Sequence, residues 1–139
     1  MSWTLQVGVK ALLKNSHGEF LILRRNPKTY GQLSGSWDLP GGRIEPGQPL
    51  LENLRREILE ETSLDIDTTN AKLLTAQSII IDQEERQVTR LTYLISDIDD
   101  QLEIKLAEED IEARWASLEQ LKSMSDLDKF ALEVVLTLT

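Results

Sequence analysis

Hydrophobic and polar residues alternate near the start of the chain, in the pattern of a β-strand with one buried face. The alternating apolar residues are Leu5, Val7, Val9, Ala11 and Leu13. A polar turn sequence follows at residues 15–18, and an apolar run at residues 20–23 comes directly after it. Two apolar strands joined by a short polar turn predict a β-hairpin.

The spacing of apolar residues becomes helical in the middle of the chain. Pro49 suits the first position of a helix, and apolar residues then recur three and four positions apart as far as about Thr62. They are Leu50, Leu51, Leu54, Ile58 and Leu59. Upstream, the polar residues 26–36 predict a long loop, and residues 37–39 predict a short strand before a pair of glycines.

The second half of the chain adds further strands and helices. Strands are expected at residues 73–81, 88–95, 102–106 and 113–116, with a charged turn at residues 82–87. Helical spacing is found at residues 117–122 and 126–138. Strands, helix, strands and helix in this order predict a mixed α/β fold in which helices cover a sheet. A chain of 139 residues has room for one substantial core, so a single domain over residues 1–139 is expected.

Composition and charge exclude several classes of protein. The apolar fraction of 40% is ordinary for a soluble globular protein, and no apolar run reaches the length of a membrane span. The first residues lack the pattern of a secretion signal, so a cytoplasmic protein is expected. The net charge of −9 disfavours nucleic acid as a partner. The absence of cysteine excludes disulfides and thiolate metal sites.

Three glutamates in the central helix form the pattern with the most chemical content. Glu57, Glu60 and Glu61 stand at positions i, i+3 and i+4, so their carboxylates share one face of the helix. Like charges this close repel each other, and they lie in the second half of the helix, where its dipole disfavours them. Hard oxygen ligands are what Mg²⁺ or Mn²⁺ prefers. A metal site is one interpretation, and a solvated glutamate-rich face is the other.

The surrounding residues decide between these interpretations. The segment from Gly42 to Leu64 resembles the Nudix box, which runs glycine, five residues, glutamate, seven residues, Arg-Glu-apolar-any-Glu-Glu-any-Gly-apolar. Residues 56–61, Arg-Glu-Ile-Leu-Glu-Glu, match the central part in full. Gln48 replaces the first glutamate of the box, and Ser63 replaces its last glycine, where a left-handed residue is expected.

The resemblance implies a fold, a reaction and a metal site. The family's fold is an α/β/α sandwich with a mixed β-sheet. Its MutT-like members are Mg²⁺-dependent pyrophosphohydrolases that cleave a diphosphate linkage in a nucleoside di- or triphosphate derivative. By this resemblance Glu57, Glu60, Glu61 and the backbone carbonyl of Gly41 bind the metal. Arg56 resembles the arginine that positions one of these glutamates, although a surface pair with Glu52 or Glu60 also fits the spacing.

Candidate substrate-binding residues lie outside the box. Arg24 resembles a phosphate-binding arginine of some relatives, and Arg25 beside it adds positive charge that the chain as a whole lacks. Trp37 is a candidate for stacking on a nucleobase, with packing in the core as the alternative. The expected partner is a small nucleotide-type molecule. Many relatives dimerise, so a homodimer is an open option.

The general base has candidates both inside and outside the box. Glu60 and Glu61 are two of them, and Glu109, in an acidic stretch before Trp115, is the third. Some family members place a loop glutamate at such a position, while a solvated acidic loop is the alternative.

Two other functions are also compatible with the resemblance. Gln48 favours a nucleotide-binding or sensing domain with weak or no turnover, whereas the absence of cysteine disfavours a Nudix-like isoprenyl diphosphate isomerase.

Overall fold

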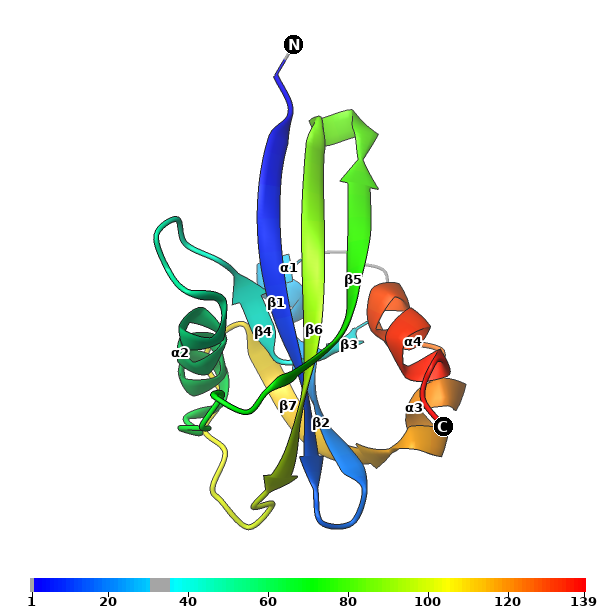
Figure 1. Cartoon of the computed structure of the whole chain (residues 1–139). Coiled ribbons are helices and arrows are strands. Elements are labelled where there is room, and N and C mark those ends of the chain that lie inside the picture. Colours follow the sequence, from blue (N-terminus) through cyan, green and yellow to red (C-terminus); the bar gives the residue numbers. More distant parts are fainter. Residues whose placement is uncertain (1, 31–35) are drawn as a thin grey trace.

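Strand alternation sorts the side chains onto two faces of a mixed sheet, and helices cover both faces (Figure 1). The computed structural model describes residues 2–30 and 36–139. The strands are β1 (Thr4–Asn15), β2 (Glu19–Arg25), β3 (Trp37–Asp38), β4 (Gly41–Arg43), β5 (Lys72–Ile81), β6 (Arg86–Ile98) and β7 (Asp110–Ser117). The helices are α1 (Pro27–Tyr30), α2 (Leu50–Thr62), α3 (Leu118–Ser123) and α4 (Lys129–Leu136), and η1 (Asp82–Glu84) is a 3₁₀ turn.

The sheet combines parallel and antiparallel pairing. Its strands are ordered β3-β2-β1-β6-β5, with β4 paired to β1 and β7 paired to β2. Strands β1 and β6 run parallel, with Val9 opposite Leu91, while β1 and β2 form the predicted antiparallel hairpin. The prediction of a mixed sheet is therefore confirmed.

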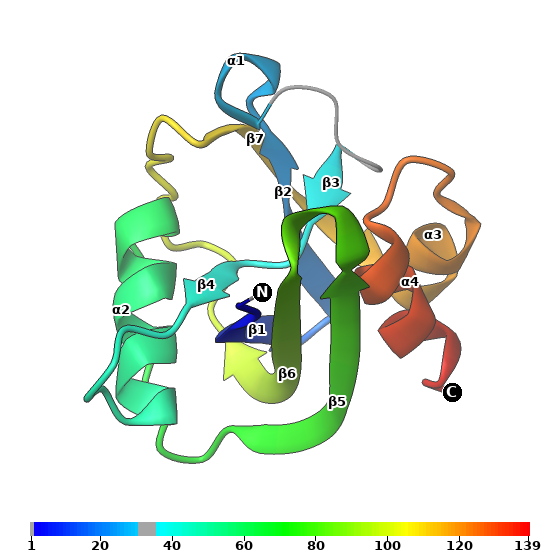
Figure 2. The ribbon, with the colours of Figure 1, turned by 90° about the horizontal axis from the view of Figure 1, so that it is seen from above.

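Alternate residues of β1 and β2 face two different cores. The residues on the side of α2 are Val9, Ala11, Leu13, Leu21 and Leu23, which pack with Leu54 and Ile58 of that helix. The residues on the other side are Leu12, Phe20 and Ile22, which pack with Leu121 of α3 and with Ala131, Val134 and Val135 of α4. Seen from above, α2 and the α3–α4 pair lie on opposite sides of the sheet, which confirms the α/β/α sandwich (Figure 2).

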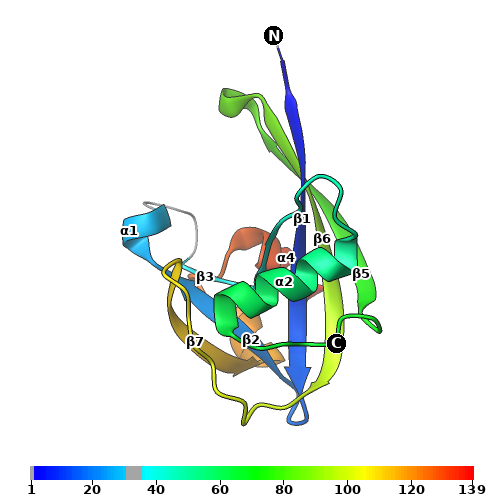
Figure 3. The same cartoon turned by 90° about the vertical axis from the view of Figure 1, so that its left-hand side faces the viewer.

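Residues 102–106 do not form the predicted strand. This segment instead donates backbone hydrogen bonds to the end of α2. The Lys105 N–H donates to the Thr62 carbonyl at 2.9 Å, and the N–H of the next residue but one, Ala107, donates to the Glu61 carbonyl at 3.3 Å. These carbonyls have no partner within their own helix. Figure 3 shows the segment passing the C-terminal end of α2, so this loop caps the helix and brings residues 107–110 beside it.

The structure also bears on the predictions for the residue after α2 and for the loop at residues 26–36. Ser63 adopts the expected left-handed conformation, with φ 66°, and its N–H donates to the Leu59 carbonyl. The predicted loop at residues 26–36 contains the one-turn helix α1, and residues 31–35 lie outside the described part of the chain. Within residues 2–30 and 36–139, no helix combines the length and hydropathy needed to cross a membrane.

Candidate active site

A cavity of about 690 Å³ opens beside the pair of glycines that precedes the box helix. It is lined by residues of strands β1 to β6, the face of α2 that carries the glutamates, the segment at residues 107–110 and the start of α4. Its acidic residues are Asp38, Glu57, Glu60, Glu61, Glu109, Asp110 and Asp128. Its basic residues are Lys10, Arg25, Arg43, Arg86, Arg90 and Lys129. The wall thus offers ligands for a cation as well as for an anion.

The two glycines of β4 admit the box glutamates. The Gly41 N–H donates to Glu61 Oε1 at 2.7 Å, and Gly41 has φ 142°, a conformation that residues with a Cβ rarely adopt. A Cβ on Gly41 would overlap the backbone of Val9, and a Cβ on Gly42 would overlap the carboxylate of Glu57. Both glycines therefore leave space that the structure uses for backbone and carboxylate.

Gly42→Ala should displace the Glu57 carboxylate. On the expectation from the Nudix box that Glu57 binds the metal, the variant should bind Mn²⁺ at least about tenfold more weakly, the loss typical when the support of a metal ligand is disturbed. Isothermal titration calorimetry of the folded variant measures the change. Gly8→Ala is the matched control, because a Cβ there has its nearest contact at 3.7 Å, an ordinary van der Waals distance. An unchanged Mn²⁺ affinity in Gly42→Ala would contradict the expectation.

The guanidinium of Arg56 lies among the side chains it was predicted to orient. It donates to Glu60 Oε1 at 3.1 Å and to Asn53 Oδ1 at 2.9 Å, and it lies 3.6 Å from Glu57 Oε1. The surface pair expected from the spacing therefore forms with Glu60. Because the same group contacts two box glutamates and is fixed by Asn53, it restrains where both carboxylates lie.

Burial makes the ionised glutamates costly. The pKa of Glu61 is raised to about 8, chiefly by burial and also by the neighbouring carboxylates Asp110 and Glu57, against the opposing effects of Lys10 and the Gly41 N–H. The pKa of Glu57 is also raised by burial and by repulsion from Glu60. A cation at this wall would favour both charged forms. The donor set and its electrostatics thus fit a hard divalent ion.

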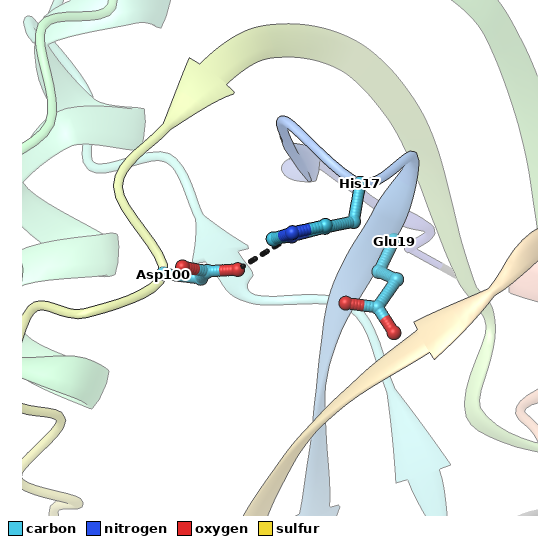
Figure 4. A group of neighbouring side chains, drawn as sticks. All are labelled: His17, Glu19 and Asp100. Carbon is cyan, nitrogen blue, oxygen red and sulfur yellow. Dashed lines mark hydrogen bonds and ion pairs between the residues drawn. The ribbon is translucent and has the colours of Figure 1, made fainter.

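The three box glutamates share the cavity but do not converge on one point. Among the described residues, the trio of His, Asp and Glu side chains whose ligand atoms all lie within 4.8 Å is His17, Glu19 and Asp100 (Figure 4). Asn15 holds that trio together, since its amide donates to Glu19 and to Asp100, at 3.0 Å in both cases. Mg²⁺ is usually held by one or two carboxylates together with water and substrate phosphates. The looser arrangement of the box glutamates is compatible with that coordination.

The predicted substrate-binding residues differ in whether they line the cavity. Arg25 lines the cavity. Arg24 lies outside the lining and forms a half-exposed pair with Glu112 at 3.6 Å. Trp37 is 3% exposed, belongs to the core on the side of α4, and lies beneath the guanidinium of Arg114 at 4.5 Å. Its geometry therefore matches the packing alternative and leaves almost none of the ring accessible to a base.

Glu109 lines the cavity, together with an acid that the sequence did not single out. Asp110 is 8% exposed, and within the described part of the chain its Oδ2 has no hydrogen-bond partner. Burial raises its pKa to about 6. The sequence signal was weak because the alternation of β7 was recognised only from Ala113, which left Asp110 in a charged loop.

A second group missed by sequence reasoning is a buried ion network. Asp38 lies 3.1 Å from Lys10 and also pairs with Arg25, which lies 3.3 Å from Asp128. Asp128 in turn pairs with Arg90 at 2.9 Å. Burial on its own would raise the pKa of Asp38, but the three surrounding cations lower it to about 2. The network joins four strands to the start of α4.

Comparison with known proteins decides the family. The profile of the NUDIX domain matches residues 4–138. The chain belongs to the Nudix family. Among solved structures, the MutT protein from Methanosarcina mazei Go1 is similar with a TM-score of 0.81 and 29% identity, covering 99% of this chain and 94% of that one. The MutT Nudix hydrolase from Burkholderia pseudomallei has a TM-score of 0.79 at 21% identity, covering 98% and 99%.

Curated Nudix relatives match over a shorter stretch. The 8-oxo-dGDP phosphatase NUDT18 of Homo sapiens is 38% identical over 56 residues, which are 40% of this chain and 16% of that protein. The m7GpppN-mRNA hydrolase NUDT17 of Xenopus laevis is 34% identical over 70 residues, which are 50% of this chain and 23% of that protein. This chain therefore spans a small part of each relative's length, and their names differ in substrate.

Proposed function

We propose that this Nudix protein is a pyrophosphohydrolase that uses Mg²⁺, or Mn²⁺ in its place, to cleave a diphosphate linkage in a nucleoside di- or triphosphate derivative. The observation that carries the proposal is the placement of Glu57, Glu60 and Glu61 on one cavity wall, against the glycine pair that gives them room. The proposed setting is a single domain over residues 1–139 in the cytoplasm, with a small molecule as partner.

The chain's own residues have distinct parts in this proposal. Glu57, Glu60, Glu61 and the Gly41 carbonyl would hold the cation, and Arg56 would position two of the carboxylates. When bound, Mg²⁺ neutralises charge on phosphate oxygens and acidifies water. Arg25 lines the same cavity and would contact the phosphates with the part of its guanidinium not engaged by Asp38 and Asp128.

Proton transfer is assigned to the acidic loop. Glu109 lines the cavity at the end of the segment that caps α2, which places it on the same wall as the box glutamates. We propose Glu109 as the general base that accepts a proton from the attacking water. Asp110 beside it is buried and carries a raised pKa of about 6, so it is the second candidate for this step.

The rival function, a sensing domain without turnover, was motivated by Gln48. In the structure Gln48 is exposed in the turn before α2, where its N–H donates to the Glu45 carbonyl at 3.1 Å, and it is not among the cavity-lining residues. A substitution at an exposed residue outside the cavity lining gives little reason to expect lost turnover. Hydrolysis is therefore the better supported function.

Hydrolysis of a substrate panel tests the proposal. The panel contains 8-oxo-dGDP, 8-oxo-dGTP, a sugar nucleotide, a dinucleoside polyphosphate and a capped dinucleotide, with release of phosphate or nucleotide as the readout. We expect turnover of at least one compound with Mg²⁺ or Mn²⁺, and at least about 100-fold less in EDTA, since the metal supplies several kcal/mol of charge stabilisation. Tight nucleotide binding without product over hours would favour the sensing domain instead.

A further inference from the structure

We propose that Arg43, Arg86 and Arg90 form a second anion-binding site in this cavity, which takes a phosphate group separate from the diphosphate linkage. The inference rests on the proposed function for the identity of that linkage. It names the substrate class as a diphosphate that carries an additional, distant phosphate.

The sheet register brings these arginines to one face. Gly8 of β1 is the Cα partner of Arg43 on β4 and also of Arg90 on β6. Paired residues on neighbouring strands point to the same face of a sheet. Arg86 lies four residues before Arg90 on β6 and so shares that face. Gly8 itself adds no side chain between the arginines, and a Cβ there would meet Val88 at 3.7 Å and the stem of Arg43 at 3.8 Å.

A neutral side chain holds two of the guanidiniums together. Gln6 Oε1 accepts a hydrogen bond from Arg43 and another from Arg86, the latter at 3.3 Å. Like charges drawn to one acceptor repel each other. An anion between them would relieve this repulsion.

The positive charge of the cluster is only partly balanced. Arg86 pairs with Glu84 at 2.9 Å, and Arg90 pairs with Asp128 at 2.9 Å. Within the described part of the chain, Arg43 has no carboxylate oxygen within 4.0 Å. In a protein with a net charge of −9, an arginine without a carboxylate partner beside two others marks a local positive field.

Distance separates this cluster from the glutamates. Lys10 is the Cα partner of Gly41, and Gly8, the partner of Arg43 and Arg90, lies two residues before it on β1, about 7 Å along an extended strand. Gln6, which accepts from Arg43 and Arg86, lies four residues before Lys10, about 13 Å along the strand. Ile79, Ile81 and Val88 line the cavity near the cluster. Guanidinium groups match phosphate in shape and charge. The ligand class is therefore a molecule with an apolar or aromatic portion between its diphosphate and the additional phosphate.

Matched ligand pairs test the site by equilibrium binding. The probes are NADP⁺ against NAD⁺ and coenzyme A against dephospho-coenzyme A, because each pair differs by one phosphate distant from its diphosphate. Calorimetry with the full chain in EDTA keeps the readout independent of turnover. We expect the phosphorylated member of at least one pair to bind about tenfold more tightly, as one or two charge-assisted hydrogen bonds would give.

Variants connect that preference to the arginines. Arg43→Gln and Arg86→Gln should each reduce it at least about threefold, a fraction of one charge-assisted hydrogen bond. Arg55→Gln is the matched control, since Arg55 is an exposed arginine paired with Asp65 on the far side of α2 from the cavity lining. Circular dichroism checks that each variant is folded. Equal affinities within both pairs, binding of no probe, or a preference that survives both variants would overturn the site.

Hydrolysis of the same four compounds with Mg²⁺ separates the two proposals. A phosphate preference in binding without turnover on any substrate would overturn the proposed function and leave the second anion site standing. Turnover with no preference between the members of each pair would overturn the second site alone.

Discussion

Glu61→Gln should lower turnover by about 10³-fold, equivalent to about 4 kcal/mol of transition-state stabilisation. Glutamine keeps an oxygen that can accept the Gly41 N–H bond now made at 2.7 Å, so the backbone around the glycine pair is preserved. It removes the negative charge that would hold the metal. Steady-state kinetics on whichever panel substrate is turned over measures the loss. Near-normal turnover in this variant would remove Glu61 from the metal site.

The same variant has a stability signature that depends on pH. Because the folded pKa of Glu61, about 8, lies above its ordinary value of 4.5, the folded state favours the protonated carboxyl. That stability is fully present below about pH 4.5 and is lost as pH rises through about 8. Glutamine resembles the protonated carboxyl and avoids the loss. In EDTA at pH 8, Glu61→Gln should therefore melt at a higher temperature than the natural chain.

Bound Mg²⁺ should reverse the order of the melting temperatures of the natural chain and Glu61→Gln. Bound Mg²⁺ stabilises the folded state by mass action, and it binds the ionised carboxylate. Thermal melts at pH 8 should therefore show a rise in Tm with Mg²⁺ for the natural chain and a much smaller rise for Glu61→Gln. Equal rises in both would contradict the assignment of this carboxylate to the cation.

Asp38→Asn should destabilise the fold by about 3–5 kcal/mol, the cost of leaving buried charges without their partner. Asp38 is 3% exposed and is surrounded by Lys10, Arg25 and Arg90. Asparagine retains an acceptor for the Leu39 N–H, but it removes the carboxylate that pairs with Lys10 and leaves Asp128 as the paired carboxylate of both arginines. Urea unfolding followed by circular dichroism measures the change in the free energy of unfolding. Thermal unfolding should show a fall in Tm of roughly 10 °C or more.

Asp65→Asn supplies the matched control for Asp38→Asn. It makes the same chemical change in an ion pair, with Arg55 at 2.6 Å, but the Asp65 side chain is 59% exposed. Exposed pairs of this kind contribute little to stability, because water screens the charges. If both variants lost equally little stability, the network around Asp38 would not be the structural element that its burial indicates.

Local patterns in the sequence predicted most of the fold. The alternation in β1 and the helical spacing of α2 reflect burial on one side of each element, which sequence records directly. The box glutamates and Arg56 were found because they lie within two turns of one helix. Such short-range geometry follows from the spacing alone.

Contacts between residues far apart in the sequence could not be predicted from those patterns. The network around Asp38 and Asp128 forms because β1 and β6 run parallel and place Lys10 and Arg90 on one face. Trp37 was ambiguous because an aromatic residue before a turn packs or stacks depending on its neighbours. Residues 102–106 alternate like a strand, yet the N–H groups of Lys105 and Ala107 bond to the end of α2, an arrangement that depends on the tertiary structure.

The anchoring of Lys105 and Ala107 to the last carbonyls of α2 fixes one further property of the molecule. Glu109 and Asp110 lie just beyond this anchor, and Asp110 begins β7 opposite Arg25 of β2. The position of both acids is therefore set by α2 and β2 and not by the end of β6. Insertions or deletions at residues 99–104 would be absorbed upstream of the anchor. The connection after β6 is thus free to vary in length while both acids stay in register with the glutamates of the box.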